Sequence, residues 1–303
     1  MELSMEKKAY FPPKQYKNNF ILIGAGGTGG YLVPNLARIL SVVNANFPSY
    51  YPEDMNTLTI VDGDEVETHN INRQNFVRND IGKMKAEVLA NRYGQAFGLE
   101  IKSCATYLEN NKQMDSFMNY NKGIDAREFI ISCVDNHRTR QMIHNYIMSH
   151  LNRTFIWLDA GNEEWNGQVV FGANTNTSIH TAMTAHDHRG GRMGDLFPTF
   201  DMPFVTEIYP DILENTETKF NSEMSCDERA VHEPQSIATN ITAANIMFNF
   251  LNLYLLGTGV PMYEVRFNTQ SNNTSTSYNK MSDPIFTACG NRVSYYEELR
   301  MSS

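Results

Sequence analysis

Short apolar runs alternate with segments of helical periodicity along the first half of the chain. Residues 19–24 form an apolar run that ends in glycines, which is typical of a strand covered on both faces. Beyond the glycines, apolar residues recur at helical spacing from Tyr31 to Val43. The pattern therefore predicts a strand, a glycine-rich turn and a helix, in that order.

The same alternation continues to about residue 171. Further strands are predicted at 58–61, 99–104, 129–133, 154–159 and 168–171, and helices at 82–97, 109–120 and 136–150. Alternating strands and helices indicate an α/β fold with a doubly wound, mostly parallel, Rossmann-like sheet. We expect an N-terminal arm at 1–18 and a nucleotide-binding adenylation domain at 19–172.

The rest of the chain follows a different pattern. Residues 173–235 are polar and irregular, and such a long connection is usually functional, so we expect a crossover loop there. A helix at 236–256, an alternating strand at 262–267 and a polar hairpin-like tail follow, with a solvated turn predicted at 271–277. We expect residues 236–303 to complete the same fold as a C-terminal antiparallel extension.

Composition and charge exclude several classes of protein. The 303 residues include 41% hydrophobic ones, enough for a large core, and the formal net charge is −9. Scattered Lys and Arg residues on an acidic chain argue against a nucleic-acid partner. The N-terminus lacks the apolar stretch of a signal peptide, and no run approaches the roughly 20 apolar residues of a membrane span. We therefore expect a cytoplasmic protein that does not enter a membrane.

The four cysteines lie far apart at Cys104, Cys133, Cys226 and Cys289, and no two form a CxxC pair. Neither a structural zinc site nor a disulfide framework is expected. Cys104 and Cys133 fall on predicted buried strands, where a thiol is usually a small apolar group.

Four glycines, Gly24, Gly26, Gly27 and Gly29, lie between the first strand and the first helix. Backbone amides at this position can face a phosphate, and the helix dipole adds positive potential. The motif predicts a nucleotide site, but it also satisfies the dinucleotide fingerprint. It therefore leaves ATP, NAD and FAD open, and an oxidoreductase with a bound dinucleotide is one alternative function.

Asp62 ends the second predicted strand. A carboxylate at this place in a Rossmann-like fold can accept hydrogen bonds from ribose hydroxyls. The alternative is that Asp62 caps the turn of its own Asp-Gly-Asp sequence.

Three blocks of sequence are similar to those of a known superfamily. Residues 61–74 resemble the Asp-x-Asp…Asn-Leu-x-Arg-Gln signature of the ThiF/MoeB/ubiquitin-activating superfamily. Residues 80–86 resemble its Asp-x-Gly-x-x-Lys helix start, and residues 132–140 its Asp-Asn-x-x-x-Arg strand end. The blocks follow the family order, and a weaker likeness extends to about residue 171.

The resemblance implies an enzyme that uses ATP to adenylate the C-terminal carboxylate of a small ubiquitin-like or sulfur-carrier protein with a Gly-Gly tail. It implies ribose binding by Asp62, phosphate contacts by Asn70, Arg73 and Lys85, and a Mg²⁺ ion held by Asp135. The candidate nucleotide-binding residues are Gly24, Gly26, Gly27, Gly29, Asp62, Asp64, Asn70, Asn72, Arg73, Gln74 and Lys85. Members of this superfamily are commonly homodimers, in which a basic residue such as Lys14 or Lys17 could reach the neighbour's site.

The chemistry gives a reason for these residue types. When a carboxylate attacks the α-phosphate and pyrophosphate leaves, negative charge grows on phosphate oxygens, and preplaced cations such as Arg73 and Lys85 stabilise it. Asp135 suits Mg²⁺, which prefers carboxylate and phosphate oxygens. The alternatives are a surface ion pair for Arg73, a solvated helix position for Lys85 and a helix N-cap for Asp135.

The sequence departs from many relatives in lacking two zinc-binding CxxC pairs. Some relatives use a cysteine near the crossover loop to accept the activated acyl group, and Cys226 is the only cysteine of this region. Asp227 and Glu228 beside it would raise its pKa. A catalytic Cys226 and direct transfer to a downstream thiol carrier therefore both stay open, as do a small peptide substrate and a non-catalytic scaffold.

Overall fold

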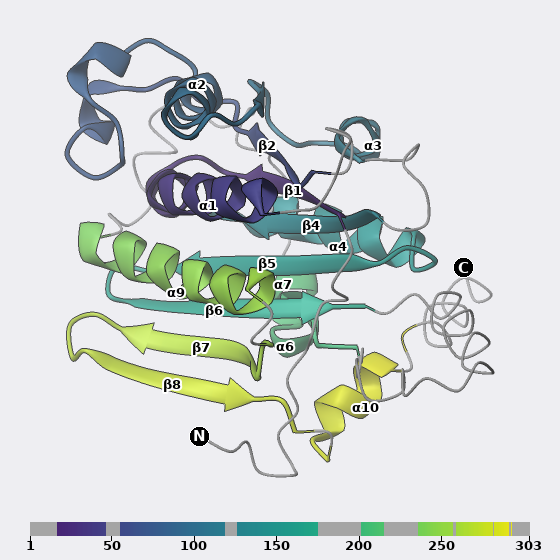
Figure 1. Cartoon of the computed structure of the whole chain (residues 1–303). Helices are drawn as coiled ribbons and strands as arrows, with labels where there is room; N and C mark the ends of the chain where they lie inside the picture. Colours follow the sequence, from purple (N-terminus) through teal and green to yellow (C-terminus); the bar gives the residue numbers. More distant parts are fainter. Residues whose placement is uncertain are drawn as a thin grey trace.

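A single eight-stranded sheet organises the molecule in the computed structural model (Figure 1). The structure describes residues 17–46, 55–118, 126–174, 201–214, 236–256, 259–280, 282–290 and 292. The strand order is β3-β2-β1-β4-β5-β6-β7-β8, parallel from β3 to β5 and antiparallel from β5 to β8. The predicted Rossmann-like sheet with a C-terminal antiparallel extension is confirmed.

The strands are β1 (Lys17–Ile23), β2 (Thr57–Val61), β3 (Ile101–Cys104), β4 (Ala126–Ser132), β5 (Phe155–Asn162), β6 (Asn166–Ala173), β7 (Met262–Asn268) and β8 (Asn273–Tyr278). The helices are α1 (Gly27–Ala45), α2 (Lys85–Phe97), α3 (Asn111–Phe117), α4 (His137–Ser149), α6 (Val205–Ile208), α7 (Asp211–Glu214), α9 (Ile237–Leu255) and α10 (Pro284–Gly290), with 3₁₀ turns η2 (Thr68–Asn70) and η3 (Arg78–Asp80).

Helices cover both faces of the sheet, and each face has its own apolar core. On one face, α1, α2 and α9 pack against the strand side chains that point to that face, such as Leu22 and Ile131. On the other, α3, α4, α6 and α7 pack against alternate strand residues such as Ile21 and Ile130. Figure 1 shows α1 and α9 side by side over the middle of the sheet. Burial on both faces explains the apolar runs in the inner parallel strands, whereas the edge strand β3 is partly exposed and carries polar residues.

Several predicted boundaries are wrong. The helix expected from residue 82 begins at Lys85, because Gly82 adopts a φ of +81° and Met84 is extended and bridged to Glu65. The helix expected at 109–120 is shorter, since Asn110 caps its start and Met118 is extended. Strand β1 includes Lys17 and Asn18, which the sequence assigned to the arm; residues 1–16, with Lys14, lie outside the described residues.

The run predicted as a solvated turn is mostly strand. Residues Asn273–Tyr278 form β8, which pairs with β7 at the edge of the sheet. Its side chains are polar because an edge strand needs only backbone pairing and can leave its side chains in water. Within the predicted loop 173–235, the described residues 201–214 include α6 and α7, and Cys226 lies outside the described residues. No helix in the described part of the chain has the length and apolar content of a membrane span.

Candidate functional site

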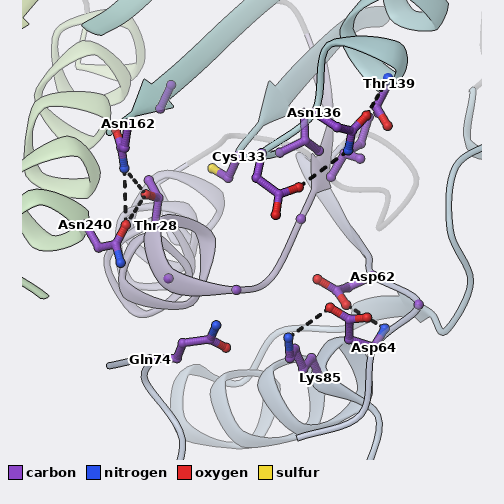
Figure 2. Close-up of a pocket in the computed structure, with 18 of the residues that line it drawn as sticks. Thr28, Asp62, Asp64, Gln74, Lys85, Cys133, Asn136, Thr139, Asn162 and Asn240 are labelled. Atoms are coloured by element: carbon purple, nitrogen blue, oxygen red, sulfur yellow. Dashed lines mark hydrogen bonds and ion pairs between the residues drawn. The ribbon is translucent and has the colours of Figure 1, made fainter. Parts of the chain in front are cut away.

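A cavity of about 1030 Å³ lies at the carboxyl ends of the parallel strands, where β1 separates β2 from β4. The connections from β1 and β4 leave on opposite faces of the sheet, which is the position where ligands bind in open α/β sheets. Most predicted site residues line this cavity: Gly24, Gly26, Gly27, Asp62, Asp64, Asn70, Arg73, Gln74, Lys85 and Asp135. Figure 2 shows several of them around the glycine loop.

The glycine loop is shaped by close backbone contacts. Gly24 has a φ of +90°, and a Cβ placed there would lie 2.7 Å from the carbonyl oxygen of Cys133. A Cβ on Gly29 would lie 2.0 Å from the carbonyl oxygen of Gly24. Gly29 is therefore needed for the contact between α1 and β1 and is not among the residues that line the cavity.

Asp62 ties the glycine loop to the end of β2. Its Oδ2 accepts a hydrogen bond from the backbone N–H of Ala25 at 2.6 Å, and its Oδ1 accepts one from Asp64 at 2.8 Å. The turn-capping interpretation is thus confirmed, and ribose binding stays a prediction. Burial, with a smaller contribution from Asp64, raises the pKa of Asp62 to about 6, although Lys85 opposes the shift.

Lys85 lies at the start of α2 and is only 5% exposed, so the interpretation as a solvated helix residue is wrong. Its Nζ lies 3.0 Å from Oδ2 of Asp64, whose Oδ1 accepts a hydrogen bond from the Tyr107 hydroxyl. Asp64 thus positions the lysine ammonium beside Asp62 at the cavity wall (Figure 2).

The segment 67–74 forms a tight loop that presents two polar side chains to the cavity. Oδ1 of Asn70 accepts from the Glu67 N–H at 2.8 Å, and the Asn70 carbonyl accepts from Arg73 and Gln74. Within the described residues, Nε of Arg73 and Oε1 of Gln74 are buried and have no hydrogen-bond partner, and Arg73 forms no ion pair. The ion-pair interpretation of Arg73 is therefore unsupported. Asn72, in contrast, is exposed and does not line the cavity.

Asp135 follows β4 and lines the cavity, but it does not cap the next helix. The N-cap of α4 is Asn136, whose Oδ1 accepts the Thr139 N–H at 2.8 Å. The interpretation of Asp135 as the N-cap is wrong, and its carboxylate faces the cavity near the amide of Asn136, at 3.5 Å.

Arg140, the last residue of the Asp-Asn-x-x-x-Arg block, has a structural role. Its guanidinium forms a buried ion pair with Asp159, at 3.0 Å, and donates to the carbonyls of Val134 and Ala160. The Ser132 hydroxyl donates to the same carboxylate. Arg140, which also lines the cavity, therefore holds the ends of β4 and β5 together next to the chain that carries Asp135.

The candidate site residues named from the sequence do not include four residues that also line the cavity, Thr28, Asn162, Gln168 and Asn240. Asn240 comes from α9, 212 residues after Thr28, and accepts a hydrogen bond from the Thr28 hydroxyl at 3.2 Å. Asn162 donates to both of them, at 2.7 and 3.2 Å. No local pattern distinguishes these side chains from other polar residues of a helix or strand.

Comparison with known protein families identifies one family. The ThiF family profile matches residues 14–281, which is most of the chain. The chain belongs to the ThiF family. No curated protein matches it.

Solved structures show the same fold at low sequence identity. A structure of E. coli MccB with MccA-N7isoASN has a TM-score of 0.54 and 14% identity, covering 92% of this chain and 68% of that one. The structure of E. coli MccB with AMPCPP and MccA has a TM-score of 0.51 and 12% identity, and the match covers 88% of this chain and 64% of that one. The structure of PaaA has a TM-score of 0.50 and 16% identity, and the match covers 87% of this chain and 64% of that one. The ThiF-family chain thus spans just under two thirds of the length of PaaA.

Two cysteines of this ThiF-family protein, Cys133 and Cys289, are poor nucleophiles. Cys133 lines the cavity, but burial and the nearby Asp159 carboxylate raise the pKa of its thiol, and its sulfur contacts that of Met247 at 3.7 Å. Burial also raises the pKa of Cys289 to about 12. Neither thiol forms the reactive thiolate readily.

The donor set fits a nucleotide triphosphate with Mg²⁺ better than a metal held by protein alone. The described residues contain no group of three or more His, Cys, Asp or Glu side chains that could hold an ion. Mg²⁺ in nucleotide sites usually takes one or two carboxylates, phosphate oxygens and water. Asp135 lines the same cavity as the glycine loop, which fits that description, and the buried polar atoms of Arg73 and Gln74 are hydrogen-bonding groups without a partner in the described residues.

Proposed function

We propose that this protein uses ATP to adenylate the C-terminal carboxylate of a small partner polypeptide and releases pyrophosphate. The observation that carries the proposal is the meeting of Arg73, Lys85 and Asp135 in one cavity with the glycine loop. Phosphoryl chemistry needs these charges, whereas hydride transfer to a dinucleotide has no use for the combination. A scaffold without catalytic activity would also have no need of them.

The polar and charged residues that line the cavity beside the glycine loop each have a role in this reaction. Ionised Asp62 accepts hydrogen bonds from the ribose hydroxyls, and the first amides of α1 face the phosphates. Arg73 and Lys85 stabilise the negative charge that develops as the α–β phosphate bond breaks. Asn70 keeps the loop in the conformation that presents Arg73 and Gln74 to the nucleotide.

Lys85 reaches the phosphates by a short movement from Asp64. Its Nζ is a hydrogen-bond length from Asp64 and borders the same cavity as the glycine loop. The Tyr107 hydroxyl continues to satisfy Asp64 when Lys85 turns to the phosphates. Asp135 would hold a Mg²⁺ ion, which supplies positive charge to neutralise the triphosphate.

The partner is proposed to be a ubiquitin-like or sulfur-carrier protein ending in Gly-Gly, with a homodimer as the working assembly. E. coli MccB, which has a similar fold, has been crystallised with AMPCPP and MccA, which supports a nucleotide and a second molecule as ligands and keeps a short peptide as the alternative substrate. The acyl group is proposed to pass to Cys226 or to a thiol on a downstream carrier.

ATP–pyrophosphate exchange with Mg²⁺ tests the proposal. The assay uses candidate Gly-Gly carriers, the same carriers without the terminal glycine, and short peptides, each with the wild-type protein and with Asp135→Ala. Lys83→Ala is the matched control, because Lys83 is exposed and lies two residues from Lys85. We expect exchange that needs the intact tail and Asp135 and is unchanged in the control.

The outcomes separate the alternatives. Exchange supported by peptides alone would replace the carrier protein with a peptide substrate. Exchange that persists in Asp135→Ala would remove the role of Asp135. Binding of NADH without binding of ATP would refute adenylation altogether, and a Cys226→Ala variant that still exchanges but no longer transfers would place transfer on Cys226.

A further inference from the structure

The cavity has two chemically different ends. The charged end comprises Asp62, Asp64, Arg73 and Lys85. The amide end comprises Thr28, Asn162, Gln168 and Asn240, none of which carries a charge. Figure 2 shows Asn162, Thr28 and Asn240 clustered on one side of the glycine loop and Asp62, Asp64 and Lys85 on the other.

Asn240 is the residue of the amide end whose orientation is fixed most clearly. The Asn162 amide donates to the Thr28 hydroxyl at 2.7 Å, and that hydroxyl donates to Oδ1 of Asn240 at 3.2 Å. Asn162 also donates to the same Oδ1 at 3.2 Å. Since the contact from the Asn162 amide requires an acceptor, the other atom of the Asn240 amide is the donor Nδ2.

This donor has no partner within the described residues, although Asn240 is only 2% exposed and lines the cavity. It lies over the first turn of α1, because a Cβ placed on Gly27 would be 2.3 Å from Nδ2. Nδ2 itself is not fully buried, so it is accessible from the cavity, where a ligand or water can accept its hydrogen bond. The geometry therefore presents a donor to a ligand beside the phosphate-binding loop.

The charge of the amide end favours one class of ligand. A pyrophosphate group needs cations, and the amide end offers only neutral groups, with the exposed carboxylate of Glu163 at its rim. The main chain of a polypeptide is neutral and needs both donors and acceptors, which amides and hydroxyls provide. The amide end is thus suited to the last residues of a polypeptide.

We infer that the amide end binds the C-terminal residue of the polypeptide substrate, with Nδ2 of Asn240 donating to the carboxylate oxygen that does not attack. This inference rests on the proposed adenylation. The other carboxylate oxygen forms the new bond to the α-phosphorus while the bond from that phosphorus to the bridging oxygen breaks, and pyrophosphate leaves with the electron pair. The bound oxygen becomes the carbonyl oxygen of the acyl-adenylate and keeps its hydrogen bond to Asn240.

Binding measurements with three probes test the inference without the natural partner. The probes are adenosine, AMP and 5′-O-[N-(glycylglycyl)sulfamoyl]adenosine, a stable acyl-adenylate analogue, and titration calorimetry gives each affinity. The variants are Asn240→Ala and, as the matched control, Asn245→Ala, an exposed asparagine of the same helix that does not line the cavity. Thermal unfolding checks that each variant is folded.

We expect the wild-type protein to bind the acyl analogue at least about tenfold more tightly than AMP. Asn240→Ala should weaken the affinity for the acyl analogue by about tenfold, which is the effect of one hydrogen bond. It should change the affinities for adenosine and AMP by less than about twofold. Asn245→Ala should leave all three affinities unchanged. If Asn240→Ala does not fold, Asn240→Asp replaces it, because this variant retains the acceptor for Thr28 and Asn162 but lacks the donor. Its affinity for the acyl analogue should fall by more than about tenfold, and its affinity for adenosine should be unchanged.

Two outcomes would overturn the inference. An acyl-analogue affinity unchanged in the folded variant would show that Asn240 does not contact the acyl group, and an equal loss for AMP would assign Asn240 to the phosphate. Failure of the proposed function has a different signature, because then the wild-type protein itself would show no preference for the acyl analogue over AMP and no pyrophosphate exchange.

Discussion

The charged and amide ends of the cavity differ in origin as well as in chemistry. The charged end is built from residues 62–85, which are close in sequence and run from the end of β2 to the first residue of α2. The amide end collects Thr28 from α1, Asn162 from β5, Gln168 from β6 and Asn240 from α9. Under the proposed function, a continuous segment supplies the charges for the phosphates, and the assembled sheet supplies the neutral groups for the acyl substrate. Four predictions test this division of roles.

The largest effect is expected at the ends of β4 and β5, where residues that follow these strands line the same cavity. Arg140→Ala leaves the Asp159 carboxylate buried and without its cation, which should lower the free energy of unfolding by about 3–5 kcal/mol. Urea unfolding measures this loss, and Arg78→Ala, at an exposed position, should change stability by less than about 0.5 kcal/mol. A loss below about 1 kcal/mol for Arg140→Ala would mean that the ion pair does not hold β4 and β5 together.

The next effect concerns the charged end alone. Lys85→Ala should slow pyrophosphate exchange by about 100-fold or more, because a preplaced cation at developing phosphate charge is lost. Lys83→Ala should keep the wild-type rate. Adenosine affinity should be similar in both variants, since adenosine lacks phosphates. A Lys85→Ala enzyme within about threefold of wild type would place the phosphate cation elsewhere.

Two glycines of the glycine loop are expected to have different roles, Gly29 in packing and Gly26 in nucleotide binding. A methyl group on Gly29 meets the Gly24 carbonyl oxygen at 2.0 Å, so Gly29→Ala should cost about 1–3 kcal/mol in urea unfolding. A methyl group on Gly26 meets its nearest neighbour, Nε2 of Gln74, at an ordinary 3.6 Å. Gly26→Ala should therefore leave stability within about 0.5 kcal/mol and reduce ATP affinity instead. Equal destabilisation by both substitutions would contradict this distinction.

The smallest effect is a pH dependence that belongs to the charged end. Burial raises the pKa of Asp62 from 3.8 to about 6, so the carboxyl is ionised, and able to accept from both ribose hydroxyls, above pH 6. Adenosine affinity should fall as the pH drops through 6, by up to about tenfold per unit. Adenosine has no phosphate that titrates in this range, so calorimetry between pH 5 and 8 isolates the protein group.

The matching variant is Asp62→Asn, whose adenosine affinity should be weaker and flat over this range. The same group affects stability in the opposite sense. A carboxyl with a raised pKa in the folded state costs stability when it is ionised above pH 6, and that cost disappears as the pH falls through 6 towards 3.8. A wild-type affinity that does not change with pH would show that Asp62 does not accept the ribose.

Elements with continuous apolar runs were predicted well, and those set by distant contacts were not. The run at 58–61 matches β2 to within one residue because a strand buried on both faces must be apolar throughout. The start of α2 was missed by three residues, since the bridge between Glu65 and Met84 keeps the chain extended up to Lys85. β8 was missed because its polar side chains resemble those of a turn, while its hydrogen bonds go to β7.

The same difference separates the two ends of the site. The sequence alone determined that a strand, a glycine loop and a helix lie in order, and that Asp62, Arg73, Lys85 and Asp135 follow at family spacing, since local backbone geometry and short-range spacing encode these features. Only the tertiary structure decided that Lys85 is buried against Asp64 and that Asn240 lies over Gly27. The contact between α9 and the first turn of α1 depends on how the whole sheet is packed, and no local pattern in either helix encodes it.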